Sequence, residues 1–253
     1  MVDTEEIKSI EEDIKKSGFP LEIEVSSVLR KDGWDLRNQA YYMDEDEGKP
    51  RAVDIVASKS YFEDFLGHNR LRILLIIECK KSQKPWVFFT TPEDRKFSAT
   101  PILTIKHCAN PKLENQRFYK WIMKSLHYAL PYGKKRAIVH YEPFKAGEGR
   151  EIFEAALQVT KALNFELKQD METSPKIPIT SIGIFFPVIV FDGHLYECQL
   201  QNGDTKVLST DYVQYLREQR ELFIIDVFTK QFLLQYLGII NKEVEALKAS
   251  LKR

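Results

Sequence analysis

The stretch Leu71-Arg-Ile-Leu-Leu-Ile-Ile-Glu-Cys-Lys80 ends an apolar run with a carboxylate and an ammonium. A short run rich in Ile and Leu between polar segments is typical of a buried strand. Because side chains on a strand alternate between its two faces, Glu78 and Lys80 share one face and Cys79 lies on the other. Charged side chains are rarely buried without a partner, so this placement indicates a functional role.

A second apolar stretch, Arg51-Ala-Val-Asp-Ile-Val-Ala57, carries Asp54 and is also predicted to be a buried strand. Carboxylates a few ångströms apart repel each other unless a cation lies between them. We therefore expect Asp54 and Glu78 to share a divalent metal ion. The alternative is an ordinary ion pair between Glu78 and Lys80 at the end of a strand.

The composition is that of a globular protein with material for a large core, because 43% of its 253 residues are hydrophobic. Lys plus Arg and Asp plus Glu each total 37, so any nucleic-acid contact must come from local patches. The three cysteines, Cys79, Cys108 and Cys198, form no C-x-x-C pair, which argues against a disulfide framework or zinc site and favours a cytoplasmic location. The apolar runs are shorter than the roughly 20 residues that a membrane-spanning helix needs, so we expect no membrane partner.

We interpret the chain as a single domain, 1–253, that begins with the order helix, three strands, helix, strand. An apolar stripe that starts near Pro20 and stops at Gly33 predicts the first helix. The other elements expected here are strands at 34–43, 51–58 and 71–80, a helix at 111–130 and a strand at 135–141. Residues 142–253 are expected to elaborate the same domain with a helix at 151–163, a hairpin of 182–190 and 194–200, a short helix at 211–219, a strand at 222–227 and a long helix from 229.

Three features together resemble the PD-(D/E)xK nuclease superfamily, and Mrr-like restriction-endonuclease folds within it. They are Asp54 on one strand, Glu78-Cys79-Lys80 closing the next, and a preceding helix, within Phe19–Gly33, that carries an acidic residue. The resemblance covers 19–141; Val53 stands where the motif has proline, and either Glu22 or Glu24 could be the helix acid. It implies an α/β fold with a restriction-endonuclease-like αβββαβ core, in which helices flank a mixed central sheet.

The resemblance also implies a Mg²⁺-dependent endonuclease, with Mn²⁺ able to substitute. Asp54, Glu78 and the Cys79 backbone carbonyl would bind the ion, and Glu22 would bind a second ion or a water. Lys80 would orient the attacking water and stabilise charge on the phosphate. Beyond these residues, Lys81 and Lys84 are candidate phosphate contacts, Gln83 is a candidate for positioning the substrate, and Trp86 is expected in the core rather than against a base.

The function expected from these residues is hydrolysis of phosphodiester bonds, most plausibly in DNA and in restriction or defence against foreign nucleic acid. The alternative is a catalytically inactive binding or scaffold module of the same fold. A homodimer is expected if both strands of a duplex are cut, with Phe228–Leu237 as candidate apolar surface. The chain contains no GxxxxGK[ST] phosphate loop, so ATP-driven cleavage would need a separate ATPase or recognition subunit.

Overall fold

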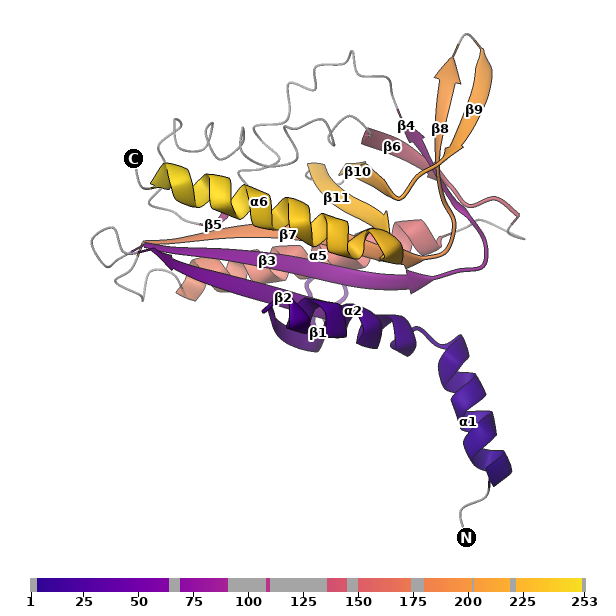
Figure 1. Ribbon diagram of the computed structural model, residues 1–253, viewed down its shortest axis with the longest axis horizontal. Coiled ribbons are helices and arrows are strands. Elements are labelled where there is room, and N and C mark those ends of the chain that lie inside the picture. Colours follow the sequence, from indigo (N-terminus) through magenta and orange to yellow (C-terminus); the bar gives the residue numbers. More distant parts are fainter. Residues whose placement is uncertain are drawn as a thin grey trace.

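A computed structural model describes residues 4–63, 69–90, 108–109, 136–144, 150–173, 180–201, 203–218 and 222–251 (Figure 1). Its described strands join in one mixed sheet with the order β1-β2-β3-β7-β11-β10-β6-β4-β8-β9, and β5 pairs with β7 off this path. The predicted α/β class is therefore confirmed. The strands are β1 (Asp35–Asp44), β2 (Lys49–Glu63), β3 (Asn69–Lys81), β4 (Trp86–Thr90), β5 (Cys108–Ala109), β6 (Arg136–Tyr141), β7 (Thr180–Asp192), β8 (Leu195–Gln201), β9 (Asp204–Ser209), β10 (Tyr212–Glu218) and β11 (Leu222–Thr229).

Helices cover both faces of the sheet (Figure 1). On one face, α2 (Phe19–Lys31) and α6 (Leu233–Leu251), which follows a 3₁₀ turn at Lys230–Phe232, pack on one cluster of buried apolar side chains. On the other face, α5 (Glu151–Thr173) packs on a second cluster. The first helix, α1 (Thr4–Lys16), extends away from the rest of the protein. Within the described ranges, no helix is long and apolar enough to cross a membrane.

Strand β3 lies inside the sheet and is buried on both faces, as its continuous apolar run predicts. Ile73, Leu75 and Ile77 belong to the cluster under α2 and α6. The alternate residues Leu74 and Ile76 belong to the cluster under α5. The predicted alternation of side chains therefore holds along the strand that ends in Glu78 and Lys80.

The second neighbour of β3 in the sheet comes from later in the chain than the strand expected at 135–141. Strand β3 pairs with β2 in antiparallel fashion and with β7 in parallel, and α5 precedes β7 in the chain. The predicted strand at 135–141 exists as β6, but β6 lies between β10 and β4, far along the sheet from β3. Strand β7 is the better neighbour because Ile184–Phe191 can be buried on both faces, whereas Ile138 and Val139 of β6 are about half exposed. The predicted helix at 111–130 lies outside the described residues.

The predicted hairpin of 182–190 and 194–200 is wrong, because β7 and β8 do not pair with each other. Strand β8 instead pairs in parallel with β4. The turn between β7 and β8 is held against the segment after β3: the Ser82 N–H donates to the Asp192 carbonyl at 3.2 Å, and the Trp86 N–H donates to the His194 carbonyl at 2.9 Å. These bonds direct the chain away from a hairpin.

A further expectation for the C-terminal part, the short helix at 211–219, is wrong. Residues 212–218 form strand β10 rather than a helix, because residues 212–217 are buried on both sides and no exposed helical face exists. Within Phe228–Leu237, the candidate dimer surface, Phe228, Phe232 and Leu237 are each at most 9% exposed, whereas Leu234 is 71% exposed. Nearby, the buried Asp226 carboxylate accepts hydrogen bonds from Tyr212 and Tyr236, both at 2.8 Å, which fixes the start of α6 on the sheet.

The turn between β7 and β8 predicts the effect of two glycine substitutions. A Cβ at Gly193 would lie 2.6 Å from the Ser82 carbonyl oxygen, so Gly193→Ala should lower the free energy of unfolding by about 1 to 3 kcal/mol. A Cβ at Gly238 in α6 meets nothing within 4 Å, so Gly238→Ala should raise it by up to about 1 kcal/mol. Urea denaturation of both variants checks this; equal effects would contradict the packing described for the β7–β8 turn.

Candidate functional site

The predicted site begins where β2 and β3 stop pairing through their main chains. The recorded pairing starts at Ile55 opposite Ile77. At the next residue, Asp54, a side-chain hydrogen bond replaces main-chain pairing: the Asp54 Oδ2 accepts a hydrogen bond from the Cys79 N–H at 2.7 Å. The Cys79 side chain is 6% exposed and lies in the cluster under α2 and α6, on the side predicted for it. Asp54 is thus tied directly to the segment that carries Glu78 and Lys80.

The Glu78 carboxylate is buried and only half satisfied. Its side chain is 1% exposed, and its Oε1 lies 2.6 Å from the Lys80 Nζ. The other oxygen, Oε2, is buried with no hydrogen-bond partner. The ion pair that formed the alternative interpretation therefore exists, but it leaves a buried carboxylate oxygen unpaired, which is unfavourable unless another group meets it.

The pKa shifts show how burial and neighbouring charges act on each of these groups. Burial, with a further contribution from Asp54, raises the pKa of Glu78 to about 8, although Lys80 acts in the opposite direction. Burial also raises the pKa of Asp54, against the Cys79 N–H and Lys80. Burial would lower the pKa of Lys80, but the neighbouring Glu78 outweighs it and the net shift is upward. Burial, together with the neighbouring Asp54, therefore disfavours the ionised form of Glu78 more strongly than Lys80 favours it.

The structure places Glu22, rather than Glu24, with these groups. Glu22 lies in the first turn of α2, and its pKa is raised by burial and by Asp54 and lowered in part by Lys80. Glu24 is 58% exposed and lies 3.4 Å from the Lys230 Nζ. The two positions point in different directions because they are two residues apart on a helix.

One residue of this cluster was not predicted from the sequence. Gln39 of β1 donates a hydrogen bond from its Nε2 to the Glu22 Oε2 at 2.6 Å. Its side chain also acts on Asp54 as a hydrogen-bonding group that lowers the pKa of that carboxyl. No sequence signal marks Gln39, since its position matters only once β1 is paired with β2.

The predicted phosphate contacts are not gathered around the carboxylates. The Lys81 Nζ donates to the Lys15 carbonyl oxygen of α1 at 2.9 Å. Gln83 is exposed, and Lys84 is half-buried with its main-chain N–H bonded to the Ser82 Oγ at 3.1 Å. Within the described residues, none of these three side chains forms a hydrogen bond or ion pair with Glu22, Asp54 or Glu78.

Trp86 is in the core, as expected, and cannot stack on a substrate base. Its side chain is fully buried. Its ring stacks on Phe191 with a centroid separation of 4.1 Å.

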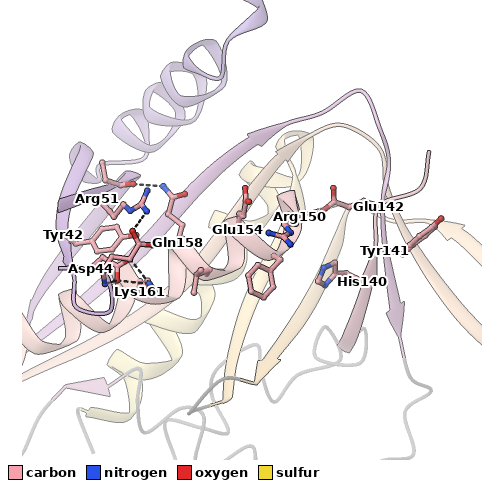
Figure 2. A pocket seen from close by; sticks show the side chains of 14 residues that line it. Tyr42, Asp44, Arg51, His140, Tyr141, Glu142, Arg150, Glu154, Gln158 and Lys161 are labelled. Carbon is pink, nitrogen blue, oxygen red and sulfur yellow. Dashed lines mark hydrogen bonds and ion pairs between the residues drawn. The ribbon is translucent and has the colours of Figure 1, made fainter. Parts of the chain in front are cut away.

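A groove of about 1220 Å³ runs along α5 (Figure 2). One end holds Tyr42, Asp44, Arg51 and Lys161, and the other end holds His140, Tyr141 and Glu142. Burial, then Asp44, then Glu78 raise the pKa of Tyr42 to about 12, so the first end lies within electrostatic reach of the carboxylates. The basic groups at that end are already paired: Lys161 lies 2.7 Å from Asp44, and Arg51 lies 2.6 Å from Glu47.

The residues suit a hard divalent cation in chemistry, although no complete ligand cluster is formed. In the part of the chain that the structure describes, no group of three or more His, Cys, Asp or Glu side chains is arranged to hold a metal ion. The unpartnered Glu78 oxygen and the oxygen donors of Asp54 are nevertheless the ligand type that Mg²⁺ prefers.

A scan against protein-family models matched no family, and searches of curated proteins and of solved structures found no significant match.

The raised pKa of Glu78 predicts how stability changes with pH when divalent cations are chelated. The folded chain holds this proton above the ordinary pKa of 4.5, up to about 8, so the associated stability is present at low pH and lost as pH rises through about 8. Glu78→Gln keeps a neutral side chain at every pH. Its unfolding free energy relative to wild type should therefore rise by at least about 1 kcal/mol between about pH 5.5 and about pH 8.5.

Urea denaturation in EDTA at several pH values measures this difference. The Lys80 pairing is one of the causes that set the pKa of Glu78, so the change of this stability difference with pH reports the ionisation of Glu78 as a whole. Glu24→Gln controls for removal of a carboxylate outside the cluster. A pH-independent difference for Glu78→Gln would show that the buried carboxylate is ionised throughout.

Proposed function

We propose that this protein is a metal-dependent endonuclease that hydrolyses phosphodiester bonds, in DNA and in a restriction or defence setting. The observation that carries the proposal is the buried Glu78 carboxylate with one unpartnered oxygen, next to Asp54 and paired with Lys80. A buried carboxylate with a neighbouring acid and a lysine is costly to maintain, and perturbed groups of this kind concentrate at functional sites.

The order of elements supports a restriction-endonuclease-like fold. Reading α2, β1, β2, β3, α5 and β7 in chain order gives αβββαβ, with β1–β3 antiparallel and β7 parallel to β3. Asp54 lies on the second of these strands and Glu78 on the third. In this proposal residues 82–150 are an insertion between the third strand and the second helix. The core then spans 19–192 rather than 19–141.

The proposed ion is Mg²⁺, with Mn²⁺ able to replace it. Mg²⁺ is often held by only one or two carboxylates together with waters and substrate phosphates, so Asp54 and Glu78 suffice without a third ligand. The Cys79 backbone carbonyl and Glu22 are the further candidates on this chain. When bound, the ion would neutralise phosphoryl charge and make a water more acidic near neutral pH.

The side chains supply orientation and charge. Lys80 is 32% exposed, so its ammonium can reach a substrate as well as Glu78. Because its pKa is raised in this structure, we assign it as a donor that stabilises charge on a phosphoryl oxygen, not as a base. Glu22, held by Gln39, is the candidate acceptor for a proton of the attacking water, whose oxygen bonds to phosphorus as the P–O bond to the leaving sugar breaks.

The inactive scaffold remains the second candidate, and specific observations favour it. The formal net charge is zero, and the basic groups at the Tyr42 end of the groove are paired with acids. Phosphate-backbone binding depends on unpaired Lys and Arg, so a nuclease of this composition would rely on local contacts or on a separate recognition subunit.

Cleavage assays test the proposed activity directly. Supercoiled plasmid, single-stranded DNA and RNA are each incubated with protein and Mg²⁺ or Mn²⁺. Lys80→Ala should lower the cleavage rate by about 100-fold or more, and Asp54→Asn should abolish cleavage. Lys168→Ala, which removes a lysine from a surface ion pair with Glu45, is the matched control and should cleave normally. Equal activity in the Lys80 and Lys168 variants would refute the assignment.

A cation titration separates binding from chemistry. Mn²⁺ should raise the melting temperature of the wild type, since a ligand at 100 times its Kd stabilises by about 2.7 kcal/mol. Asp54→Asn should lose this rise. Lys80→Ala should retain or increase it, because the ammonium that competes for Glu78 is gone. If Mn²⁺ and Mg²⁺ leave the wild type unchanged, the scaffold function is favoured instead.

A further inference from the structure

Gln39 adopts a backbone conformation that its residue type disfavours. Its φ is +47°, in the left-handed region, although it lies in the middle of β1 and is not a glycine. The recorded pairs on either side are Asn38 with Ile55 and Ala40 with Val53, so Gln39 stands opposite Asp54 without a regular pair. Such outliers persist only where the surroundings impose them, and they concentrate at functional sites.

Strand β1 changes face at this residue. Asn38 accepts a hydrogen bond from Ser26 of α2 at 3.2 Å, so it faces the α2 side of the sheet. Ala40, two residues later, is buried in the cluster on the α5 side. Residues two apart on a regular strand share a face, so the left-handed residue produces the switch. The switch leaves the Gln39 side chain beside both Glu22 and Asp54.

The chemistry of the side chain fits this position. A glutamine amide carries two N–H donors, one of which donates to the Glu22 Oε2 at 2.6 Å. A neutral donor between two carboxylates reduces their repulsion without adding a positive charge that would compete with a cation. If the position needed only a left-handed backbone, glycine or asparagine would serve with less strain.

We propose that Gln39 is a positioning residue whose amide fixes the carboxylates of Glu22 and Asp54 relative to each other. Its effect on a bound cation rests on the proposed function. The structural alternative is that Gln39 only accommodates the change of face in β1. The positioning role and the purely structural role predict different Mn²⁺ affinities for a variant that relieves the backbone strain and also removes the amide.

Gln39→Gly and Gln39→Asn make this separation. Glycine relieves the left-handed strain, and asparagine tolerates it while drawing the amide back by about 1.5 Å. Both variants should fold, because glycine and asparagine both accept the left-handed backbone found at Gln39. Both should bind Mn²⁺ about 10- to 100-fold more weakly, measured by the cation-induced melting shift, because ligands lose their orientation when such partners are removed. Unchanged Mn²⁺ affinity in both variants would overturn the proposal.

A second measurement does not depend on metal binding or activity. In the metal-free protein, the side-chain amide resonances of Gln39 should shift in Glu22→Gln and in Asp54→Asn. They should stay unchanged in Glu24→Gln, which alters the same helix but a carboxylate that contacts Lys230. If the Gln39 amide resonances stay unchanged in both Glu22→Gln and Asp54→Asn, the proposed positioning role of Gln39 is wrong. If these resonances shift but the wild type neither binds Mn²⁺ nor cleaves nucleic acid, the positioning role of Gln39 is supported and the nuclease proposal fails.

Discussion

Burial of the Glu78 carboxylate is the constraint on which the site depends. Strand β3 lies between β2 and β7 and is apolar on both faces, so the Glu78 side chain near its end is cut off from water. A carboxylate placed there must be neutralised or protonated. Lys80 lies on the same face of the strand and pairs with Glu78, and the Asp54 carboxylate accepts a hydrogen bond from the Cys79 N–H between them. The strand that builds the core is thus also the one that concentrates charge.

The first half of the core was predictable because its sequence patterns act locally. Gly33 ends the helix with a φ of +81°, and Gly48 closes the β1–β2 turn with a φ of +63°. Periodicity failed further along, where both faces of a strand are buried and no polar face remains. The pattern at 211–219 therefore predicted a helix where the structure has strand β10, and the parallel pairing of β3 with β7 was not predicted. Pairing between segments about a hundred residues apart leaves no local trace.

The site residues likewise fall into those that local sequence patterns predicted and those that depend on tertiary arrangement. Alternation along one strand was enough to place Glu78 and Lys80 together, and their ion pair is found at 2.6 Å. The choice between Glu22 and Glu24 needed the angle at which α2 meets the sheet, which the sequence does not contain. Gln39 was invisible, because a left-handed glutamine has no sequence signature. Lys81 remains a candidate phosphate contact, and its hydrogen bond to the Lys15 carbonyl oxygen at the end of α1 was not predicted.

The Glu78–Lys80 pair also bears on how a cation would bind. In a site where the ion alone offsets buried negative charge, the protein unfolds without it. Here Lys80 lies 2.6 Å from Glu78 and already offsets part of that charge without an ion. An arriving cation would compete with the ammonium for Glu78, which weakens binding but frees Lys80 for a second anion. In the proposed function a phosphate beside the ion would be such an anion, so the competition would couple cation binding to the release of the lysine proposed to contact the substrate.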